Sequence, residues 1–364
     1  MTLRYDRAPM MAYWEVTQAC GLTCRHCRAD AVPHRDPREL STEEGEQLLG
    51  ALASFGEKPV HLVLTGGDPL RRPDIYHLIS HAVDLGLIVS VTPSGTPLLT
   101  WEAIAHLRAA GVRSLAFSLD GSTAERHDSI RGVAGTFART VTAIRWSLEQ
   151  SLPVQVNTLV SSETAPDLAQ TYGLVSGLGA QRWAVFFLIA TGRGGTLTEV
   201  TPDESEAILE WLSDCSERQP PVIKTTEAHH IRRIDALKHG RSTAVKQAWG
   251  VRDGAGIMFI SHRGEIYPSG FLPIRTGNIR RDDPVAVYRK ASIFRSLRDA
   301  EALKGKCGRC EFRVICGGSR ARAYAASGDP LESDPLCPYE PGQKRPVVGG
   351  DVESTRPAAA GRSG

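Results

Sequence analysis

Over the first 220 residues, the spacing of apolar positions alternates between a strand-like and a helical pattern. Short apolar runs of strand length lead into longer segments with helical periodicity. The strand-like runs cover residues 13–17, 60–65, 87–92, 114–118, 154–159 and 183–189. The helical patterns cover residues 42–55, 73–85, 101–110, 137–150, 167–178 and 203–218. Ser41 with Glu44 predicts a capping box at the first helix, and Thr201 before Pro202 predicts the start of the last.

Six strand–helix repeats predict an α/β protein with a parallel sheet wrapped by helices. A closed barrel of eight such units typically takes about 250 residues. The repeats here end near residue 220, so we expect a partial (β/α)6 barrel of the TIM type over residues 10–220. A doubly wound open sheet is the alternative that the pattern alone leaves open.

The rhythm changes after residue 220. A strand-like run at 222–226 is followed by a basic, helix-prone stretch, and we treat 221–255 as a connection. Runs at 256–261 and 265–268 flank a turn and predict a β-hairpin, and helical pieces follow at 285–290 and 292–301. These features predict a small α+β C-terminal domain over 256–340. Residues 341–364 are rich in Gly, Pro, Ser and Ala and predict a disordered tail.

Composition narrows the class of protein. The chain has 364 residues, 41% hydrophobic and 23% charged, with a net charge of +2, which is typical of a soluble globular protein. This balance gives no electrostatic reason to expect nucleic acid or a membrane as a partner. We see neither a signal peptide nor an apolar run of transmembrane length, so we expect a cytoplasmic protein. In a reducing compartment the eight cysteines indicate metal ligands before disulfides.

Three of the cysteines follow the first predicted strand. Cys20, Cys24 and Cys27 have the spacing C-x3-C-x2-C, and the next cysteine along the chain is Cys215. A 4Fe–4S cluster normally takes four cysteine ligands, so a cluster held here would keep one iron without a protein ligand. An open site on a reducing cluster favours catalysis over storage. A zinc knuckle is the competing interpretation.

Four more cysteines lie near the C-terminus. Cys307, Cys310, Cys316 and Cys337 could fully ligate a second 4Fe–4S cluster. A structural zinc ion is the alternative, because zinc favours the C-x2-C element. Cys215 falls within a predicted helix, and we expect it to be a packed core thiol.

The first cysteine motif resembles the signature of the radical S-adenosylmethionine (SAM) superfamily. His26 fits as well, because that family places an aromatic residue before the last cysteine. The resemblance implies that SAM chelates the fourth iron through its amino and carboxylate groups. It also implies that one electron splits SAM into methionine and a 5′-deoxyadenosyl radical, which abstracts a hydrogen atom from a substrate.

Further motifs carry the resemblance at the ends of successive predicted strands. They are 65–69 (Thr-Gly-Gly-Asp-Pro), 92–95, 118–121 and 127–132, with Asn157 and the 192–194 loop after later strands. Asp68 stands where the family more often has Glu. By this resemblance the SAM contacts would be His26, Gly66, Gly67, Asp68, Ser94, Ser118 and Arg131.

The C-terminal spacing resembles part of the SPASM domain, which binds two auxiliary clusters. Arg320 and Ser269 stand where that domain usually has cysteines. The resemblance therefore implies one auxiliary 4Fe–4S cluster, and two clusters with seven cysteine ligands in total. The second cluster would relay an electron, accept one from a substrate radical, or hold a lid.

The arrangement with a single auxiliary cluster resembles that of radical SAM enzymes that trim tetrapyrrole side chains in haem biosynthesis. The same architecture serves enzymes that form thioether or carbon–carbon links in ribosomally made peptides. A non-catalytic iron–sulfur carrier or scaffold is a third possibility. Only nineteen residues precede Cys20, which favours a small anionic substrate over a peptide. We expect a flavodoxin- or ferredoxin-type reductant as partner.

One basic segment supplies candidate substrate contacts. His229, His230, Arg232 and Arg233 follow the sixth strand–helix unit, and arginine binds carboxylates bidentately. The competing interpretation is a solvated helix face with ordinary surface histidines.

Overall fold

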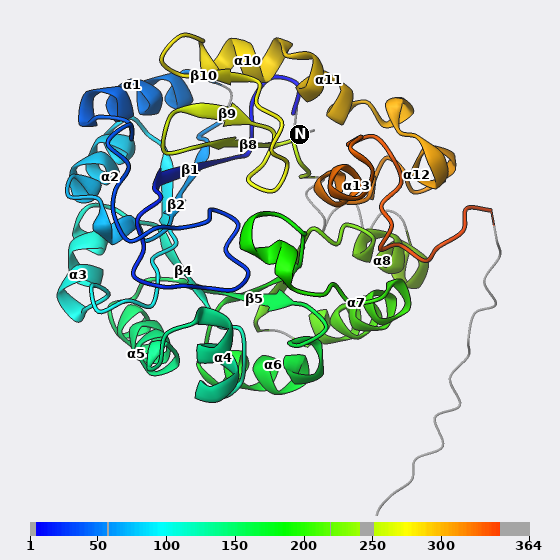
Figure 1. Ribbon diagram of the computed structural model, residues 1–364, viewed down its shortest axis with the longest axis horizontal. Helices are drawn as coiled ribbons and strands as arrows, with labels where there is room; N and C mark the ends of the chain where they lie inside the picture. The colour runs from blue at the N-terminus through cyan, green and yellow to red at the C-terminus, as the bar shows by residue number, and fades with distance from the viewer. Residues whose placement is uncertain (1–4, 57, 219, 241–250, 343–364) are drawn as a thin grey trace, which may run out of the picture.

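The computed structural model describes residues 5–56, 58–218, 220–240 and 251–342, and its sheet organises the molecule (Figure 1). Ten strands follow the order β10-β9-β8-β1-β2-β3-β4-β5-β6-β7. Their bounds are β1 Met11–Thr17, β2 His61–Gly66, β3 Ile88–Val91, β4 Ser114–Ser118, β5 Val154–Val160, β6 Arg182–Phe187, β7 Val222–Thr226, β8 Ile257–Ile260, β9 Glu265–Tyr267 and β10 Gly277–Asn278.

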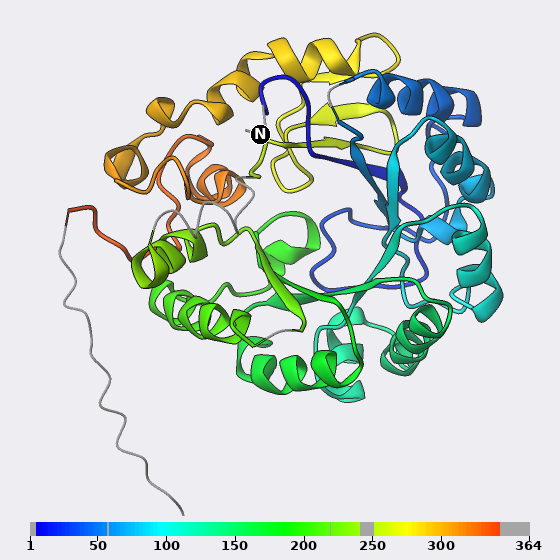
Figure 2. The same ribbon diagram turned by 180° about the vertical axis from the view of Figure 1, so that it is seen from behind.

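Helices wrap the outside of this curved sheet in both views (Figures 1 and 2). They are α1 Thr42–Ala53, α2 Ile75–Asp84, α3 Trp101–Ala109, α4 Ala124–Arg131, α5 Thr136–Glu149, α6 Leu168–Gly177, α7 Pro202–Ser216, α8 Ile231–His239, α10 Pro284–Lys290, α11 Ser292–Arg298, α12 Gly305–Arg309 and α13 Arg320–Ser327. Short 3₁₀ turns follow some strands, among them η1 Pro69–Arg71 and η3 Gly192–Thr196. All six predicted helices of the first 220 residues are present, whereas α4 was not predicted.

The sheet is mostly parallel, which confirms the predicted α/β class. Strand β1 lies between β2 and β8 and runs parallel to both, with Tyr13 in register with Val63 on one side and Phe259 on the other. The β8–β9 and β9–β10 pairs are antiparallel. Within the described ranges β7 and β10 end the strand order and do not pair with each other, as expected of an incomplete barrel.

The sheet does not end near residue 220, and this corrects the predicted domain boundaries. Strand β7, placed in a connection by the sequence, pairs with β6 in parallel. The predicted hairpin forms as β8 and β9, but it extends the same sheet because β8 pairs with β1. A contact between segments some 245 residues apart leaves no local signal, so hydrophobic rhythm alone could not reveal it. The predicted tail, 341–364, lies outside the described residues beyond 342.

Local sequence explains the first and last helices of the repeat region. Ser41 and Glu44 form the predicted capping box at α1, and Thr201 and Glu204 form another at α7. These reciprocal bonds satisfy backbone N–H groups that a helix start leaves without partners. Cys215 is buried in α7, as expected of a core thiol. Within the described residues, no helix combines the length and apolar character needed to cross a bilayer.

Candidate active site

The carboxyl ends of the parallel strands surround a cavity of about 230 Å³. All three cysteines of the first motif line it, together with six of the seven predicted SAM contacts: His26, Gly66, Gly67, Ser94, Ser118 and Arg131. Asn157 and Arg193 line it too, as do Phe271 and Arg28, which the sequence did not single out. Phe271 follows the hairpin, and only the pairing of β8 with β1 brings it to this edge.

Gly66 and Gly67 let the end of β2 approach the start of the cysteine loop. A Cβ atom on Gly67 would lie 2.3 Å from the Ala19 carbonyl oxygen, and one on Gly66 would lie 2.3 Å from that of Thr17. The Gly67 N–H donates to the Thr17 carbonyl at 2.8 Å, and the Asp68 N–H donates to the Ala19 carbonyl at 2.7 Å. Because no side chain fits, glycine is required here for contact between two backbone segments.

Asp68 is the predicted SAM contact that the structure places outside the cavity lining. Its carboxylate is fully buried and accepts hydrogen bonds from the Thr96 hydroxyl at 2.6 Å and the Ser94 N–H at 3.3 Å. Burial raises its pKa, and these hydrogen bonds oppose the rise. The side chain of Asp68 thus ties the β2 loop to the β3 loop.

The cysteine loop presents hydrogen-bond donors to its own sulfurs. The Leu22 N–H points to Cys20 Sγ at 3.4 Å, and the Ala31 N–H points to Cys27 Sγ at 3.4 Å. Arg131 Nη1 lies 3.8 Å from Cys24 Sγ. Donors around cysteine sulfur are among the features that set the potential of iron–sulfur clusters. The loop therefore fits a cluster with three thiolate ligands, and the cavity beside it leaves space for a ligand of the remaining iron.

A buried ion pair between Arg131 and Asp120 lies next to Cys24. Arg131, at the end of α4, places Nη2 at 2.5 Å from Asp120 Oδ2, and His26 Nε2 lies 3.9 Å from the same oxygen. Burial favours the neutral form of Asp120, but the charge of Arg131 and the hydrogen bond from the Leu159 N–H oppose this effect, and the pKa of Asp120 is lowered. Burial lowers the pKa of His26 to about 4, so this ring is neutral near pH 7.

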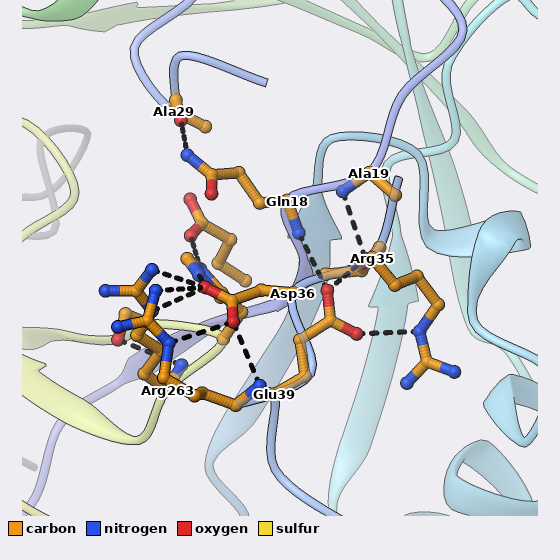
Figure 3. A network of polar contacts seen from close by, with 12 residues as sticks. Gln18, Ala19, Ala29, Arg35, Asp36, Glu39 and Arg263 are labelled. Atoms are coloured by element: carbon orange, nitrogen blue, oxygen red, sulfur yellow. Dashed lines mark hydrogen bonds and ion pairs between the residues drawn. The ribbon is translucent and has the colours of Figure 1, made fainter. Parts of the chain in front are cut away.

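A polar network fixes the cysteine loop to the β8–β9 hairpin (Figure 3). Glu39 accepts hydrogen bonds from Thr17 at 2.6 Å and Arg35 at 2.7 Å. Asp36 pairs with Arg263 of the hairpin.

The same link continues beside the cavity through two further residues of the loop and hairpin. Glu15 accepts from His262 at 2.7 Å and from Arg28 at 2.5 Å. Arg28 also lies 4.5 Å from the centre of the Phe259 ring. These contacts join segments far apart in the sequence, so the hairpin packs against Arg28, which lines the cavity.

The four C-terminal cysteines also come together. Cys307, Cys310, Cys316 and Cys337 line a second, small cavity of about 30 Å³. Their sulfurs again receive N–H groups, from Asp334 to Cys307, from Phe312 to Cys310 and from Gly318 to Cys316, each at 3.4 Å. In the described part of the chain, no group of three or more His, Cys, Asp or Glu side chains is arranged to hold a single metal ion.

Arg320, which stands where the sequence resemblance implied a cysteine, makes structural contacts. Its side chain is buried, with Nη1 donating to the Glu332 carbonyl at 2.6 Å and Nη2 lying 3.7 Å from Cys307 Sγ. Ser269 is likewise buried, beside Asp253.

The predicted substrate residues 229–233 do not line the large cavity. All four are buried: His229 Nδ1 donates to the Gly318 carbonyl at 3.0 Å, and Arg232 donates to the Ile315 carbonyl at 3.2 Å. Arg233 pairs with Glu206 at 2.5 Å and stacks 4.7 Å from the Tyr339 ring centre. The interpretation as a solvated face is wrong, because these side chains are buried against the C-terminal cysteine segment, which lies beside α8 (Figures 1 and 2).

Arg322 of α13 connects the two cysteine sites. It donates to the Leu188 carbonyl of the large cavity at 3.0 Å and to the Glu227 carbonyl at 2.7 Å. It also lies 3.5 Å from Asp334, whose N–H faces Cys307. Neither Arg322 nor Glu227 carried a sequence signal, because each depends on a contact between distant segments.

Comparison with known proteins agrees with this geometry. The radical SAM superfamily model matches residues 14–175. A protein of Methanosarcina barkeri named AdoMet-dependent heme synthase is 42% identical over 93% of this chain and 98% of its own. One of that name from Oleidesulfovibrio alaskensis is 37% identical over 92% and 88%, whereas a PqqA peptide cyclase of Rhodopseudomonas palustris is 28% identical over 92% and 88%.

Solved structures show the same fold at low identity. Streptococcus suis SuiB bound to S-adenosylmethionine superposes with a TM-score of 0.70 at 15% identity, over 92% of this chain and 78% of that one. The family implies a 4Fe–4S cluster and SAM, and the three-cysteine loop with its adjoining cavity fits both. The chain therefore belongs to the radical SAM superfamily, in one family with the proteins named AdoMet-dependent heme synthase.

Proposed function

We propose that this enzyme converts propionate side chains of an iron-containing tetrapyrrole precursor into vinyl groups, as the last step towards haem. The observation that carries the proposal is the 42% identity to a heme synthase along nearly the whole of both chains. In the reaction, a propionate loses one hydrogen atom, then CO₂ and one electron, and a carbon–carbon double bond remains. The cluster and SAM supply, when bound, the 5′-deoxyadenosyl radical that takes the hydrogen atom.

The residues of this chain would prepare that step at the large cavity. Ser94 and Ser118 offer hydroxyl groups at its wall, and Arg131 offers a cation held in place by Asp120. We assign these groups to the carboxylate and ribose of SAM. The apolar side chains of Phe271 and Leu188 form another part of the wall, where an apolar macrocycle would displace water.

A second 4Fe–4S cluster at Cys307, Cys310, Cys316 and Cys337 would accept the electron released by the substrate. Its support is the shared cavity, the N–H groups aimed at three sulfurs, and the link through Arg322 to the large cavity. A flavodoxin or ferredoxin would supply the reducing electron, in the cytoplasm.

The test uses protein reconstituted anaerobically with iron and sulfide. Incubation with SAM, dithionite and iron-coproporphyrin should yield 5′-deoxyadenosine together with a product that has lost CO₂ and two hydrogen atoms per side chain, as measured by mass spectrometry. The same reconstitution with Cys310→Ala should keep SAM cleavage and lose turnover of the tetrapyrrole. Release of 5′-deoxyadenosine without any change in the porphyrin would reject this substrate class.

A peptide maturase is the second candidate. It is favoured by more distant relatives such as the PqqA peptide cyclase, and by the fold shared with SuiB, which has been solved with its precursor peptide SuiA. A cross-linked peptide product, with no change in the porphyrin, would establish it. The carrier or scaffold hypothesis is not retained, because the similar chains are named as enzymes.

A further inference from the structure

Three arginines line the large cavity, and they differ in how their charge is balanced. Arg28 pairs with Glu15 and Arg131 pairs with Asp120. Arg193, in the turn η3 after β6, has no carboxylate partner among the described residues. Its Nη2 atom is buried without a hydrogen-bond partner. A cation beside the cysteine loop is therefore left uncompensated by the protein.

Arg193 is attached to the cysteine loop by three hydrogen bonds. Its Nε donates to the Cys24 carbonyl at 2.9 Å, its Nη1 to the Ala31 carbonyl at 3.0 Å, and its backbone N–H to the Cys27 carbonyl at 3.0 Å. The three carbonyls are distributed along residues 24–31, the segment that carries the cluster ligands Cys24 and Cys27. The planar guanidinium suits this task, because its donors have fixed directions.

The preceding glycine makes this approach possible. Gly192 adopts a positive φ of 53°, and a Cβ atom there would lie 2.6 Å from the carbonyl oxygens of Cys27 and Arg28. Any side chain at 192 would push the turn away from the loop. The turn is thus shaped to bring Arg193, and its charge, against the residues that hold the cluster.

Charge near an iron–sulfur cluster sets its reduction potential. Three thiolates make the site negative, and reduction adds a further electron. A fixed, partly buried cation favours the reduced form, since the attraction is screened less than in bulk solvent. We propose that Arg193 is a positioning residue that holds the three-cysteine loop and, through its unbalanced charge, raises the reduction potential of the SAM-binding cluster.

The inference requires the cluster that the family implies and does not depend on the tetrapyrrole substrate. Its test is a redox titration of the reconstituted enzyme followed by electron paramagnetic resonance, without substrate. The signal that SAM perturbs identifies the first cluster. At a fixed potential, Arg193→Gln should lower the ratio of reduced to oxidised first cluster roughly tenfold, whereas Arg193→Lys should keep a ratio close to that of the wild type.

Arg25→Gln is the matched control. Arg25 lies on the same loop, but it is exposed and its charge is balanced by Glu163 at 2.7 Å, so its loss should leave the ratio unchanged. An unchanged ratio in Arg193→Gln with full iron content would overturn the proposal, as would an equal fall in Arg193→Lys. If Arg193→Gln does not retain iron, the lysine variant decides: retained iron with the wild-type ratio supports the role of charge, and lost iron refutes it.

The results that would reject the proposed function differ from those that would reject the role of Arg193. A porphyrin that stays unchanged in the wild-type enzyme leaves the titration of Arg193 variants as informative as before, because that titration measures the cluster alone. Conversely, a normal haem product with an unshifted ratio in Arg193→Gln would remove this inference and keep the proposed function.

Discussion

Gly67→Ala should remove the first cluster while the fold remains. The added Cβ would lie 2.3 Å from the Ala19 carbonyl oxygen, where real Cβ atoms stay at least about 3.0 Å away, so one backbone must move by about 0.7 Å (3.0 Å less 2.3 Å). That carbonyl directly precedes Cys20 and also accepts the 2.7 Å bond from the Asp68 N–H. We expect a destabilisation of about 1–3 kcal/mol from the overpacking.

The displacement matters more than the energy, because ligand geometry around a cluster tolerates little change. Gly67→Ala should therefore bind about four fewer irons per chain after reconstitution and form little 5′-deoxyadenosine from SAM and dithionite. The assays are iron analysis, visible absorbance and chromatography of the nucleoside, with circular dichroism to confirm the fold.

Gly173→Ala supplies the matched control. Gly173 lies within α6, and a Cβ atom there meets nothing within 4 Å. The same chemical change should stabilise that helix by up to about 1 kcal/mol and leave iron content and SAM cleavage intact. If Gly67→Ala kept its full iron content and the wild-type rate of SAM cleavage, the close approach of β2 to the cysteine loop would have no role in holding the cluster.

Three further predictions follow from buried charge and from the ligands. Asp120→Asn leaves the Arg131 guanidinium buried without its partner and should cost about 3–5 kcal/mol in urea unfolding, against less than about 1 kcal/mol for Glu163→Gln at the exposed Arg25 pair; equal losses would contradict the role of burial. Burial raises the pKa of Glu227 to about 8, with a further rise from nearby Asp253. The folded protein thus keeps a proton that the unfolded chain releases near pH 4. Its stability should fall by roughly 1 kcal/mol per pH unit between about pH 5 and 8, and the melting temperature of Glu227→Gln should fall less over that range; parallel curves would refute the shift. Replacing the three N-terminal cysteine ligands together with alanine should abolish SAM cleavage and remove about four irons per chain, and an unchanged iron content would refute the ligand assignment.

The repeat pattern predicted the first six strands and their helices because each is encoded locally. Apolar spacing distinguishes strand from helix, and Ser41 with Glu44 fixes where α1 begins. Helix α4 was not predicted because its sequence is strongly polar and only two of its residues, His127 and Ile130, are buried. Its apolar period is too weak to be read without the packing around it.

The candidate residues divide in the same way. The cysteines and Gly66-Gly67 could be found from spacing, because cluster ligation and close backbone contact each demand one residue type. The side chain of Asp68 and the four basic candidates of α8 and its start lie outside the lining of the large cavity, since residue type shows what a side chain can do but not where it points. Arg232 and Arg233 have the sequence of an exposed basic face, yet a segment some 80 residues further along covers them.

The sequence by itself determined the α/β class, the two cysteine groups and the family, because these rest on local periodicity and on residues at fixed spacing. The tertiary structure decided that β7 and β8 join one sheet, that Phe271 and Arg28 reach the cavity, and that Arg193 lies unbalanced against the cysteine loop. Each of these depends on contacts between segments far apart along the chain. Burial and charge compensation are properties of such contacts, so no single stretch of sequence carries them.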